Sequence, residues 1–549
     1  MTSMALNSAA GLSGMLKDGH RHFEGVEGAV LRNVEAAKDL SRIIASSLGP
    51  NGMNKLVVNH LGRIIVTSDC AAIVRELEIE HPAARMLSMA SETQDKECGD
   101  GTNLTVSFAG ELLTNTEDLI RMGLHPSEIV AGYRAAGEKL MEILPTLTCS
   151  EMADGRSKEE LIRVVTPVLA AKQHGSESIL APLVADACLG VVNRKGKATI
   201  NPESVRVAKI LGGSVGQSKV IHGFVALRGV ETTVKFADAA KVCVFGCGIE
   251  ASTTEAKGTV LMKDADDLKG YNLTEEKKME EIIKSISDAG TKVVVSGGSI
   301  SEMAMHFIER YGMMCMKIGS KWELRRLCSA VNATALVRLG PPTPDEMGYA
   351  DSVKVQEVGG RRITVFSQSE ESAKDGCRLS TILLRASTSN LLQDLERAVD
   401  DGVHAAKTAC RDARLVPGAG AVEMELSTQI RTFADSRPGL DQYAIRAFAS
   451  CLEFVPRTLA QNAGLDAQAV VAALGAAHAN GDAKAGVDIE AADGKGSGVC
   501  ECRALDLLAA KTSAFQLAID AALTVLRVDQ IIMAKQAGGG MKNATMGQT

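Results

Sequence analysis

Cys98-Gly99-Asp100-Gly101-Thr102-Asn103 is the stretch around which the chemistry of this chain is organised. Two glycines flank an aspartate, so the backbone can approach a polyphosphate closely with its amides pointing inward. Asp100 offers a hard oxygen ligand and Thr102 a hydroxyl, which are groups that a magnesium–nucleotide complex needs. Gly-Asp-Gly also occurs in ordinary turns, so the motif gains weight only if the rest of the chain supplies the other parts of a site.

Two further glycine turns adjoin predicted helices. Apolar residues at helical spacing predict an amphipathic helix over 25–48, which ends where Leu48-Gly49-Pro50-Asn51-Gly52 forbids continuation. Gly418-Ala419-Gly420 precedes a helix predicted from Val422 onward, and Gly-Asp-Gly itself opens a helix predicted over 103–117. Helix N-terminal amides bind anions, so each turn is a candidate phosphate nest. For the turn at Leu48–Gly52, a plain helix-ending turn is the alternative.

Three aspartates complete a set of groups suited to ATP hydrolysis. A hairpin predicted over 55–58 and 63–67 ends in Thr67-Ser68-Asp69, and a helix predicted over 390–412 carries Asp401. Phosphoryl transfer needs a metal, amides that hold the phosphates, and a carboxylate that orients or deprotonates the attacking water. We therefore assign Asp100 to magnesium and the other two aspartates to the water. The chain has no Walker P-loop and no protein-kinase signature, and for any one aspartate alone a surface charge is the simpler interpretation.

The composition describes a folded, multidomain chain. At 549 residues it is too long for one core, and 45% hydrophobic with 23% charged residues is ordinary for a globular protein. Lys and Arg are interspersed with acids at a net charge of −7, and aromatics are 3%, so no nucleic-acid partner is expected. The 13 cysteines are scattered singly, which predicts reduced thiols in the cytosol and no zinc site. No run of 18 apolar residues occurs, so no membrane partner is expected and the predicted location is cytoplasmic.

The middle of the chain changes character twice. Helices over 158–169 and 179–192 precede a strand over 205–211, and 215–365 reads as an inserted α/β unit with a parallel core. Inside that unit, Thr274 is expected to cap a charged helix, and 321–331 is predicted to be a helix with a core stripe and a wet face. The apolar spacing after the insertion matches the first 150 residues, so both chain ends are expected to form one domain.

Six motifs, in order, resemble the signature of the group II chaperonins: Leu48-Gly-Pro-Asn-Gly-Met-Asn-Lys55, Thr67-Ser-Asp69, Gly99-Asp-Gly-Thr-Asn103, Val399-Asp-Asp401, Gly418-Ala-Gly-Ala421 and Leu526-Arg-Val-Asp-Gln-Ile-Ile532. The match runs nearly end to end. Within that family, the longer segments at 81–84, 320–327, 396–402 and 525–535 are most similar to one subunit type of the eukaryotic cytosolic chaperonin.

The resemblance implies a multidomain α/β fold of the chaperonin type. A helical equatorial domain would be formed by both chain ends, over 1–149 and 405–549. A small α/β intermediate domain would cover 150–214 and 369–404. An α/β apical domain would span 215–368, with a helical lid protrusion at about 250–280.

The resemblance also implies roles for individual residues around ATP or ADP and Mg²⁺. Asp100 would hold the metal, Asp69 would lie near the γ-phosphate, and Asp401 would descend from the intermediate domain to activate water only when that domain closes. The remaining positions would bind the nucleotide, with the last three at its nucleoside end: Ser47, Leu48, Gly49, Pro50, Ser68, Gly101, Thr102, Asn103, Leu104, Ala419, Gly420 and Asp506.

The function implied is that of a subunit in an ATP-dependent, hetero-oligomeric double ring. Such a ring encloses and folds non-native cytosolic proteins, such as cytoskeletal proteins, and closes its lid when ATP is hydrolysed. Its partners are sister subunits and clients, and the helix over 321–331 is a candidate client-binding surface, although the pattern alone favours a core stripe. Two rival interpretations are a ring member whose site is inert and a self-contained Mg-dependent phosphotransferase with an apolar pocket beside Asp100.

Three positions depart from the family pattern. Cys70 stands where Gly is common, Asn103 where Thr is common, and Asn59 where the hairpin turn usually has Asp. A Cβ at position 70 would matter if the backbone there needed a positive φ or a close phosphate approach. On that ground the sequence predicts a subunit that binds ATP but hydrolyses it slowly.

Overall fold

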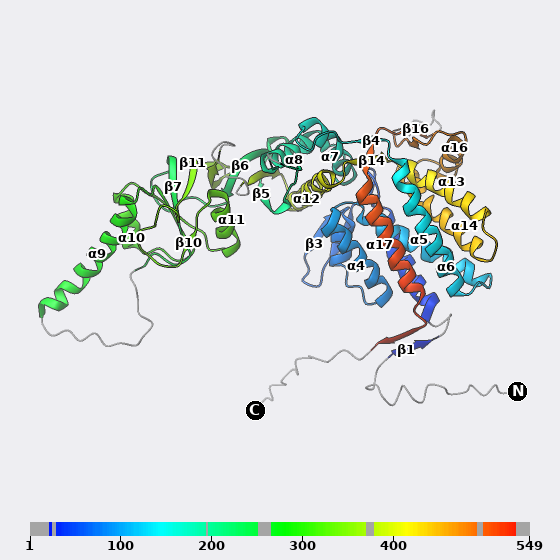
Figure 1. Cartoon of the computed structure of the whole chain (residues 1–549). Helices are drawn as coiled ribbons and strands as arrows, with labels where there is room; N and C mark the ends of the chain where they lie inside the picture. The colour runs from blue at the N-terminus through cyan, green and yellow to red at the C-terminus, as the bar shows by residue number, and fades with distance from the viewer. Residues whose placement is uncertain are drawn as a thin grey trace, which may run out of the picture.

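The computed structural model describes residues 21–24, 29–193, 196–250, 265–368, 378–490 and 498–533. These residues form three regions in a row: a helical region that carries both chain ends, a central region, and a sheet-rich region from which α9 projects (Figure 1). Among the described helices, none combines the length and the apolar character that a membrane crossing requires.

The helical region is built from both ends of the chain around one core, as predicted. Phe108 lies at its centre, with ring centroids 5.6 Å from Phe448 and 5.3 Å from Phe515 in edge-to-face geometry. Gly110 lets two helices approach closely, because a Cβ there would lie 2.2 Å from Ser41 Cβ. Its helices are α2 (Leu31–Ala45), α3 (Cys70–Glu76), α4 (Pro82–Cys98), α5 (Thr102–Arg121), α6 (Pro126–Ile143), α13 (Ala421–Asp435), α14 (Asp441–Leu452), α15 (Phe454–Asn462), α16 (Ala467–Ala479) and α17 (Leu508–Leu526).

Short paired strands also belong to the helical region or border it. The predicted hairpin is confirmed as β2 (Lys55–Val58) paired with β3 (Ile64–Thr67). Asn59 serves in its turn, since its side-chain oxygen accepts from the amides of Leu61 and Arg63. The other pairings are β1 (Arg21–Glu24) with β18 (Gln530–Met533), β14 (Arg414–Pro417) with β4 (Ser150–Glu151) and β17 (Leu505–Leu507), and β15 (Ala485–Val487) with β16 (Val499–Glu501).

The central region packs three helices against two strands around a second core. The helices are α7 (Lys158–Lys172), α8 (Glu177–Val191) and α12 (Ser389–Arg411), and the strands are β5 (Val205–Leu211) and β13 (Ser380–Ala386). The buried face of α12 is mostly apolar but also carries acids, because Asp394 and Asp401 are buried along with its aliphatic residues. Buried carboxylates need partners, so this face of α12 marks the place to look for a site.

The large sheet is mixed, with strand order β5-β13-β6-β12-β11-β7-β8-β9 and β10 paired to β7. Its predicted parallel core is confirmed by the parallel pairs β7–β8, β8–β9 and β10–β7. The antiparallel strands β6 and β11 were not predicted. The strands are β6 (Lys219–Ala226), β7 (Phe236–Phe245), β8 (Val293–Ser296), β9 (Met314–Lys317), β10 (Ala335–Leu336), β11 (Gly348–Val358) and β12 (Arg361–Ser367).

The helices of the sheet-rich region are α9 (Ala265–Asp288), α10 (Glu302–Arg310) and α11 (Lys321–Val331). The predicted cap at Thr274 is wrong, because α9 begins at Ala265 and continues through that position. Residues 251–264 of the predicted lid lie outside the described residues. The stripe and wet face predicted for α11 are confirmed: Leu324 and Leu327 are buried, while Trp322 is 70% exposed.

Candidate active site

All three glycine turns have the left-handed backbone that frees amides for an anion. Gly101 (φ 79°) is the N-cap of α5 and Gly420 (φ 81°) is the N-cap of α13, while Gly49 (φ 81°) follows α2. Ala419, beside Gly420, also has a positive φ, of 51°, which is uncommon for a residue with a side chain. The turns therefore supply two helix N-termini and one nest of backbone amides, which are the groups that bind an anion.

Neighbouring side chains hold these turns in place. The helix α15 contacts two of them, because a Cβ at Gly49 would lie 2.4 Å from Leu459 Cδ2 and one at Gly420 would lie 3.0 Å from Pro456 Cβ. Asn103 fixes the turn after α2 to the start of α5, since its Nδ2 donates to Ser47 Oγ at 3.0 Å and to the Ile44 carbonyl at 3.2 Å. The departure at Asn103 thus keeps a polar tie to the predicted Ser47.

Asp100 lies half-buried between charges from three elements. Burial raises the pKa of its carboxyl, the positive charge of Lys172 opposes that rise, and Asp506 adds to it. A bound cation would favour the ionised carboxylate, and Mg²⁺ commonly takes one or two protein carboxylates together with waters and phosphate oxygens. Within the described ranges, no group of three His, Cys, Asp or Glu side chains could hold a metal alone. The residues therefore fit a magnesium ion that arrives with a nucleotide.

Asp69 and Asp401 are brought together by a residue that the sequence did not point to, Lys172. Its Nζ lies 2.6 Å from Asp69 Oδ1 and 3.0 Å from Asp401 Oδ2. Both aspartates are 6% exposed. Asp69 comes from the loop after β3 and caps α3, where its Oδ2 accepts from the Ala72 amide at 3.2 Å. Asp401 comes from α12, so residues far apart in the chain meet at one lysine at the end of α7.

The two carboxylates differ in proton affinity. Burial raises the pKa of Asp401 well above its ordinary value, and the charge of Lys172 offsets only part of that rise. Burial acts in the same direction on Asp69, but the charge and hydrogen bond of Lys172 and the Ala72 amide outweigh it, so the pKa of Asp69 is lowered. A carboxylate with a raised pKa is the better proton acceptor, whereas one with a lowered pKa stays ionised. The pair thus suits a base beside a permanent anion.

The helix α12 reaches the Gly-Asp-Gly turn because Gly99 has no side chain. Gly99 ends α4 with φ 74°, and a Cβ there would lie 2.4 Å from His404 Cβ and 3.5 Å from Asp401 Cα. Any larger residue would separate the two elements. The first glycine of the motif is therefore required for the approach of α12.

Asp506 lies beside the third glycine turn. A Cβ at Gly418 would be 3.1 Å from Asp506 Oδ2, and the Gly418 amide donates to the Ala504 carbonyl at 2.9 Å. Lys511 Nζ lies 2.9 Å from Asp506 Oδ2 and also pairs with Glu423, the third residue of α13. Lys511 and Glu423, both buried, were not predicted from the sequence.

The remaining predicted residues divide between the turns and the core. Thr102 is buried at the first position of α5, and Leu48 and Pro50 are half-buried in the turn after α2. Ser68 Oγ donates to the Lys172 carbonyl at 3.4 Å, next to Asp69. Leu104 is buried and belongs to the apolar core of the helical region.

Cys70 does not have the backbone on which the prediction of slow hydrolysis depended. It is the first residue of α3, whereas among the described residues the positive-φ positions with side chains are Ala239, Asn332 and Ala419. Its thiol is buried 3.8 Å from Ser91 Oγ, and burial raises its pKa to about 12. The Cβ at position 70 thus imposes no left-handed strain on the site.

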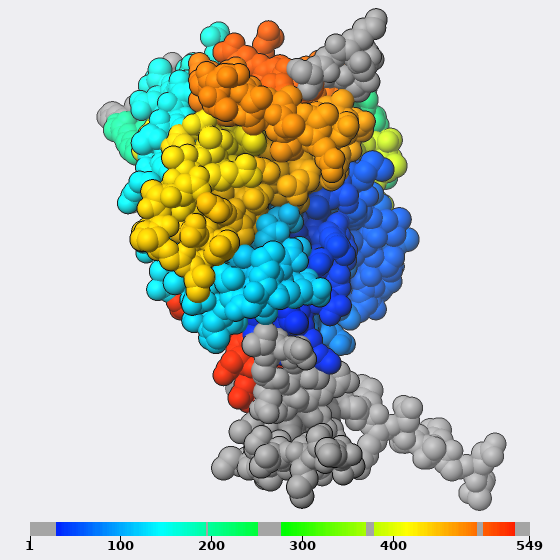
Figure 2. All heavy atoms as spheres, turned by 90° about the vertical axis from the view of Figure 1, so that its right-hand side faces the viewer, coloured from blue at the N-terminus to red at the C-terminus, as the bar shows by residue number. Residues whose placement is uncertain are grey.

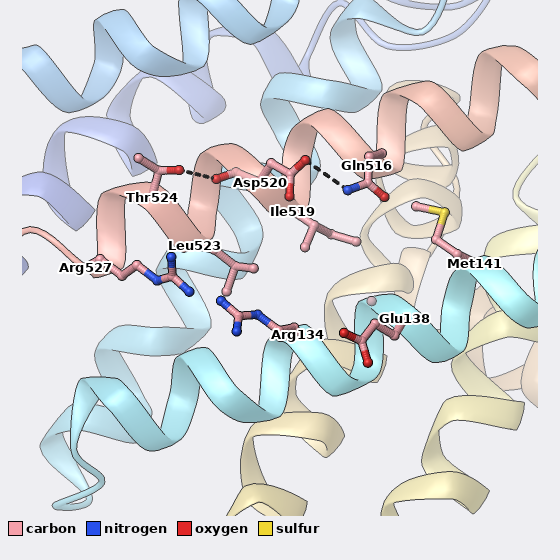
Figure 3. A pocket seen from close by; sticks show the side chains of 10 residues that line it. Arg134, Glu138, Met141, Gln516, Ile519, Asp520, Leu523, Thr524 and Arg527 are labelled. Carbon is pink, nitrogen blue, oxygen red and sulfur yellow. Dashed lines mark hydrogen bonds between the residues drawn. The ribbon is translucent and has the colours of Figure 1, made fainter.

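A pocket of about 600 Å³ lies elsewhere, between α6 and α17 (Figure 3). Arg134 and Glu138 face it from α6, and Asp520 and Arg527 face it from α17 and its end. It includes neither Asp100 nor any other predicted site residue. It therefore gives no support to a phosphotransferase pocket beside Asp100.

Comparison with known proteins agrees with the motifs. The TCP-1/cpn60 chaperonin family matches residues 40–536. T-complex protein 1 subunit theta of Arabidopsis thaliana is 50% identical over 97% of this chain and 96% of its own length. The theta subunits of Dictyostelium discoideum and Homo sapiens are each 46% identical over 98% of this chain and over 99% and 97% of their own lengths. The subunit type that the longer motifs resemble is the theta subunit, which these matches confirm. The chain therefore belongs to the TCP-1/cpn60 chaperonin family.

Proposed function

We propose that this chain is an ATP-hydrolysing subunit of a double-ring, hetero-oligomeric chaperonin of the cytosol, with sister subunits as ring partners and non-native proteins, such as cytoskeletal proteins, as clients. Its domains would be equatorial (1–149 and 405–549), intermediate (150–214 and 369–404) and apical (215–368). The similarity to T-complex protein 1 theta subunits over nearly the whole chain supports this assembly.

One observation carries the enzymatic part of the proposal: Lys172 joins Asp69 and Asp401 beside the Gly-Asp-Gly turn. The three glycine turns would bind the phosphates through backbone amides, and Asp506 would face the nucleoside end. Asp100 would hold Mg²⁺, which neutralises phosphate charge when bound. Asp69 would stay ionised and orient the attacking water, while Asp401, with its raised pKa, would take the proton from that water.

Hydrolysis at this subunit, and not mere occupancy, is favoured by two features. Asp401 reaches the site from α12, and Cys70 has ordinary helical backbone. The general base and the metal ligand come from different regions, so hydrolysis would depend on how α12 lies on the helical region. Such coupling would let ATP turnover drive lid closure.

The test uses the purified complex with Asp401→Asn in this chain alone. A photoactivatable, α-labelled ATP analogue is crosslinked after incubation, and the ratio of diphosphate to triphosphate is read on the peptide from this chain. We expect the parent chain to carry mostly diphosphate and the variant mostly triphosphate. Asp400→Asn is the matched control, because Asp400 is the exposed neighbour of Asp401.

Three outcomes separate the rivals. Equal diphosphate on the parent and on Asp401→Asn would contradict the assigned base. Triphosphate on both would identify an inert ring member. Turnover by the isolated chain, with no double ring in electron micrographs of the endogenous complex, would favour a self-contained phosphotransferase.

A further inference from the structure

A second acid on α12 forms a separate contact with the helical region. Asp394 lies seven residues before Asp401, which places both on one face of the helix. We propose that Asp394 and Thr67 form a latch, in which they act as positioning residues that hold α12 where Asp401 reaches Asp69 and Lys172. The inference rests on the proposed function, because it assigns these residues to the docking of the proposed base.

The latch consists of two hydrogen bonds and one ion pair on one buried carboxylate. Thr67 Oγ1 donates to Asp394 Oδ1 at 2.6 Å, Gln173 Nε2 donates to Asp394 Oδ2, and Arg397 Nη1 lies 3.5 Å from Oδ1. Thr67 is fully buried and Asp394 is 7% exposed. Burial raises the pKa of Asp394, while the Thr67 hydrogen bond is the first of the contacts that oppose the rise. A carboxylate in this position needs its donors, because an unsatisfied buried acceptor is costly.

Thr67 connects this carboxylate to the proposed site. Its hydroxyl has one proton, which is used toward Asp394, and its oxygen accepts the Asp69 amide at 3.0 Å. The connection therefore runs from α12 through one hydroxyl to the backbone of Asp69. Removal of that hydroxyl would free both the helix and the residue that caps α3.

The end of α7 repeats the same connection. Lys172 binds Asp69 and Asp401, and the next residue, Gln173, binds Asp394. The two acids of α12 thus contact the neighbouring residues Lys172 and Gln173, and Asp394 also accepts a hydrogen bond from β3. If the central region, with α7 and α12 packed in one core, moved away from the helical region, Asp394 would lose Thr67 as Lys172 and Asp401 lost Asp69, so the contact has the character of a two-state catch.

The test compares Thr67→Val with Thr67→Ser in the assembled complex. Valine has the shape of threonine without the hydroxyl, whereas serine keeps the hydroxyl. We expect Thr67→Val to bind the photoactivatable ATP analogue within about threefold of the parent but to form diphosphate about 10 to 100 times more slowly, the factor expected for an unsatisfied buried acceptor. Thr67→Ser should retain the parental rate. Asp394→Asn, which removes the charge from the other side, should behave like Thr67→Val.

The matched control is Gln393→Ala. Gln393 is the neighbour of Asp394 and also contacts the helical region, through Arg63 Nη2 at 3.0 Å, but that contact is exposed. The complex with Gln393→Ala should therefore hydrolyse ATP at the parental rate. Equal rates for Thr67→Val, Asp394→Asn and the parent would overturn the latch. An equal loss of rate in Thr67→Ser would also overturn the latch, because it would indicate general damage to the site. The same holds if Thr67→Val lowers binding of the ATP analogue as much as it lowers the rate.

A second readout separates the latch from the proposed function. Hydrogen exchange of the α12 amides, measured in nucleotide-free complex, should be faster in Thr67→Val than in Thr67→Ser and the parent. This readout needs no hydrolysis. If Asp401→Asn turns over at the parental rate, the assigned base is wrong but the exchange comparison still decides the latch; unchanged exchange in Thr67→Val rejects it.

Discussion

Replacing Lys172 by methionine should loosen the junction of α7, α12 and the loop after β3. Methionine keeps most of the volume and removes the charge. Lys172 Nζ lies 2.6 Å from Asp69 and 3.0 Å from Asp401, so each attraction is about 6 kcal/mol at an effective dielectric constant of about 20. Burying the three charges costs several kcal/mol per ion, so the intact cluster is close to balanced.

The variant is not balanced, because two buried carboxylates would remain without a counter-ion. Breaking a buried pair in this way costs about 3 to 5 kcal/mol, which is roughly a 100- to 5,000-fold rise in local opening. Native-state hydrogen exchange reports that opening directly. A suitable probe is the Gln173 amide, which donates to the Leu169 carbonyl at 2.7 Å at the end of α7.

The pH dependence has a definite sign. Burial raises the pKa of Asp401 in the folded chain, and loss of Lys172 would raise it further. The folded state then binds more protons than the unfolded state, so stability falls as pH rises above the ordinary aspartate value near 3.8 and levels off above the raised pKa. The defect of Lys172→Met should accordingly be smallest in acid and largest above neutral pH.

Two comparisons make this prediction refutable. Adding Asp401→Asn to Lys172→Met removes one uncompensated charge and should restore much of the protection. Lys158→Met is the matched control, because Lys158 lies on α7 like Lys172 and its Nζ is 2.6 Å from Asp186 of α8, with both side chains exposed. Such pairs contribute about 1 kcal/mol or less. Protection in Lys172→Met equal to that in Lys158→Met, or no recovery in the double variant, would refute the buried cluster.

Three further predictions follow from single residues. His81 caps α4 by accepting the Ala83 amide at 3.3 Å. Burial, then the charge of Arg32, lowers the pKa of His81 from its ordinary value of 6.5, so the cap is intact above pH 6.5 and is lost as pH falls below that value. His81→Asn should abolish this dependence and stabilise the first turn of α4 by about 1 kcal/mol in acid, as measured by hydrogen exchange. Cys70→Gly should not speed ATP turnover and should cost about 1 kcal/mol in the stability of α3, because position 70 is helical; faster turnover would show that the side chain limits the site. Gly99→Ala should slow diphosphate formation at least tenfold by pushing α12 away, whereas Gly123→Ala, also at positive φ but with open space around it, should not; equal rates in the two would contradict the close approach.

The sequence was most informative where one local pattern decides one element. The helix α11 and the strand β5 have the predicted bounds. The stripe that contains Leu324 and Leu327 has the spacing of a helix, and the short β-branched run of β5 is typical of a strand. The strands β6 and β11 were not predicted, because their pairing is antiparallel and long-range. Lys219 pairs with Leu383, and Gly348 pairs with Val242. Such partners are set by the whole sheet and leave little local trace.

The site itself shows the same division. Glycine turns and acids next to them are local signals, so Asp69, Asp100 and the three turns could be named from the sequence. Lys172 and Lys511 could not, because each ends or lies in an apolar helical run where a lysine is ordinarily a solvated side chain. Only the tertiary structure reveals that both are buried among acids. A lysine that closes an apolar stripe is the signal that could have prompted a search.

In the proposed function, the docking of α12 would control hydrolysis through the proton affinity of Asp401 as well as through its position. Burial is the first cause of the raised pKa of that carboxyl. If α12 left the helical region, Asp401 would return to water and its pKa would fall toward the ordinary value, so the group would become a weaker base as it moved away. Asp394 would leave Thr67 in the same motion. On the proposed function, a strong base therefore exists only in the docked arrangement, and we expect an undocked subunit to retain ATP even if a water molecule lies beside the γ-phosphate.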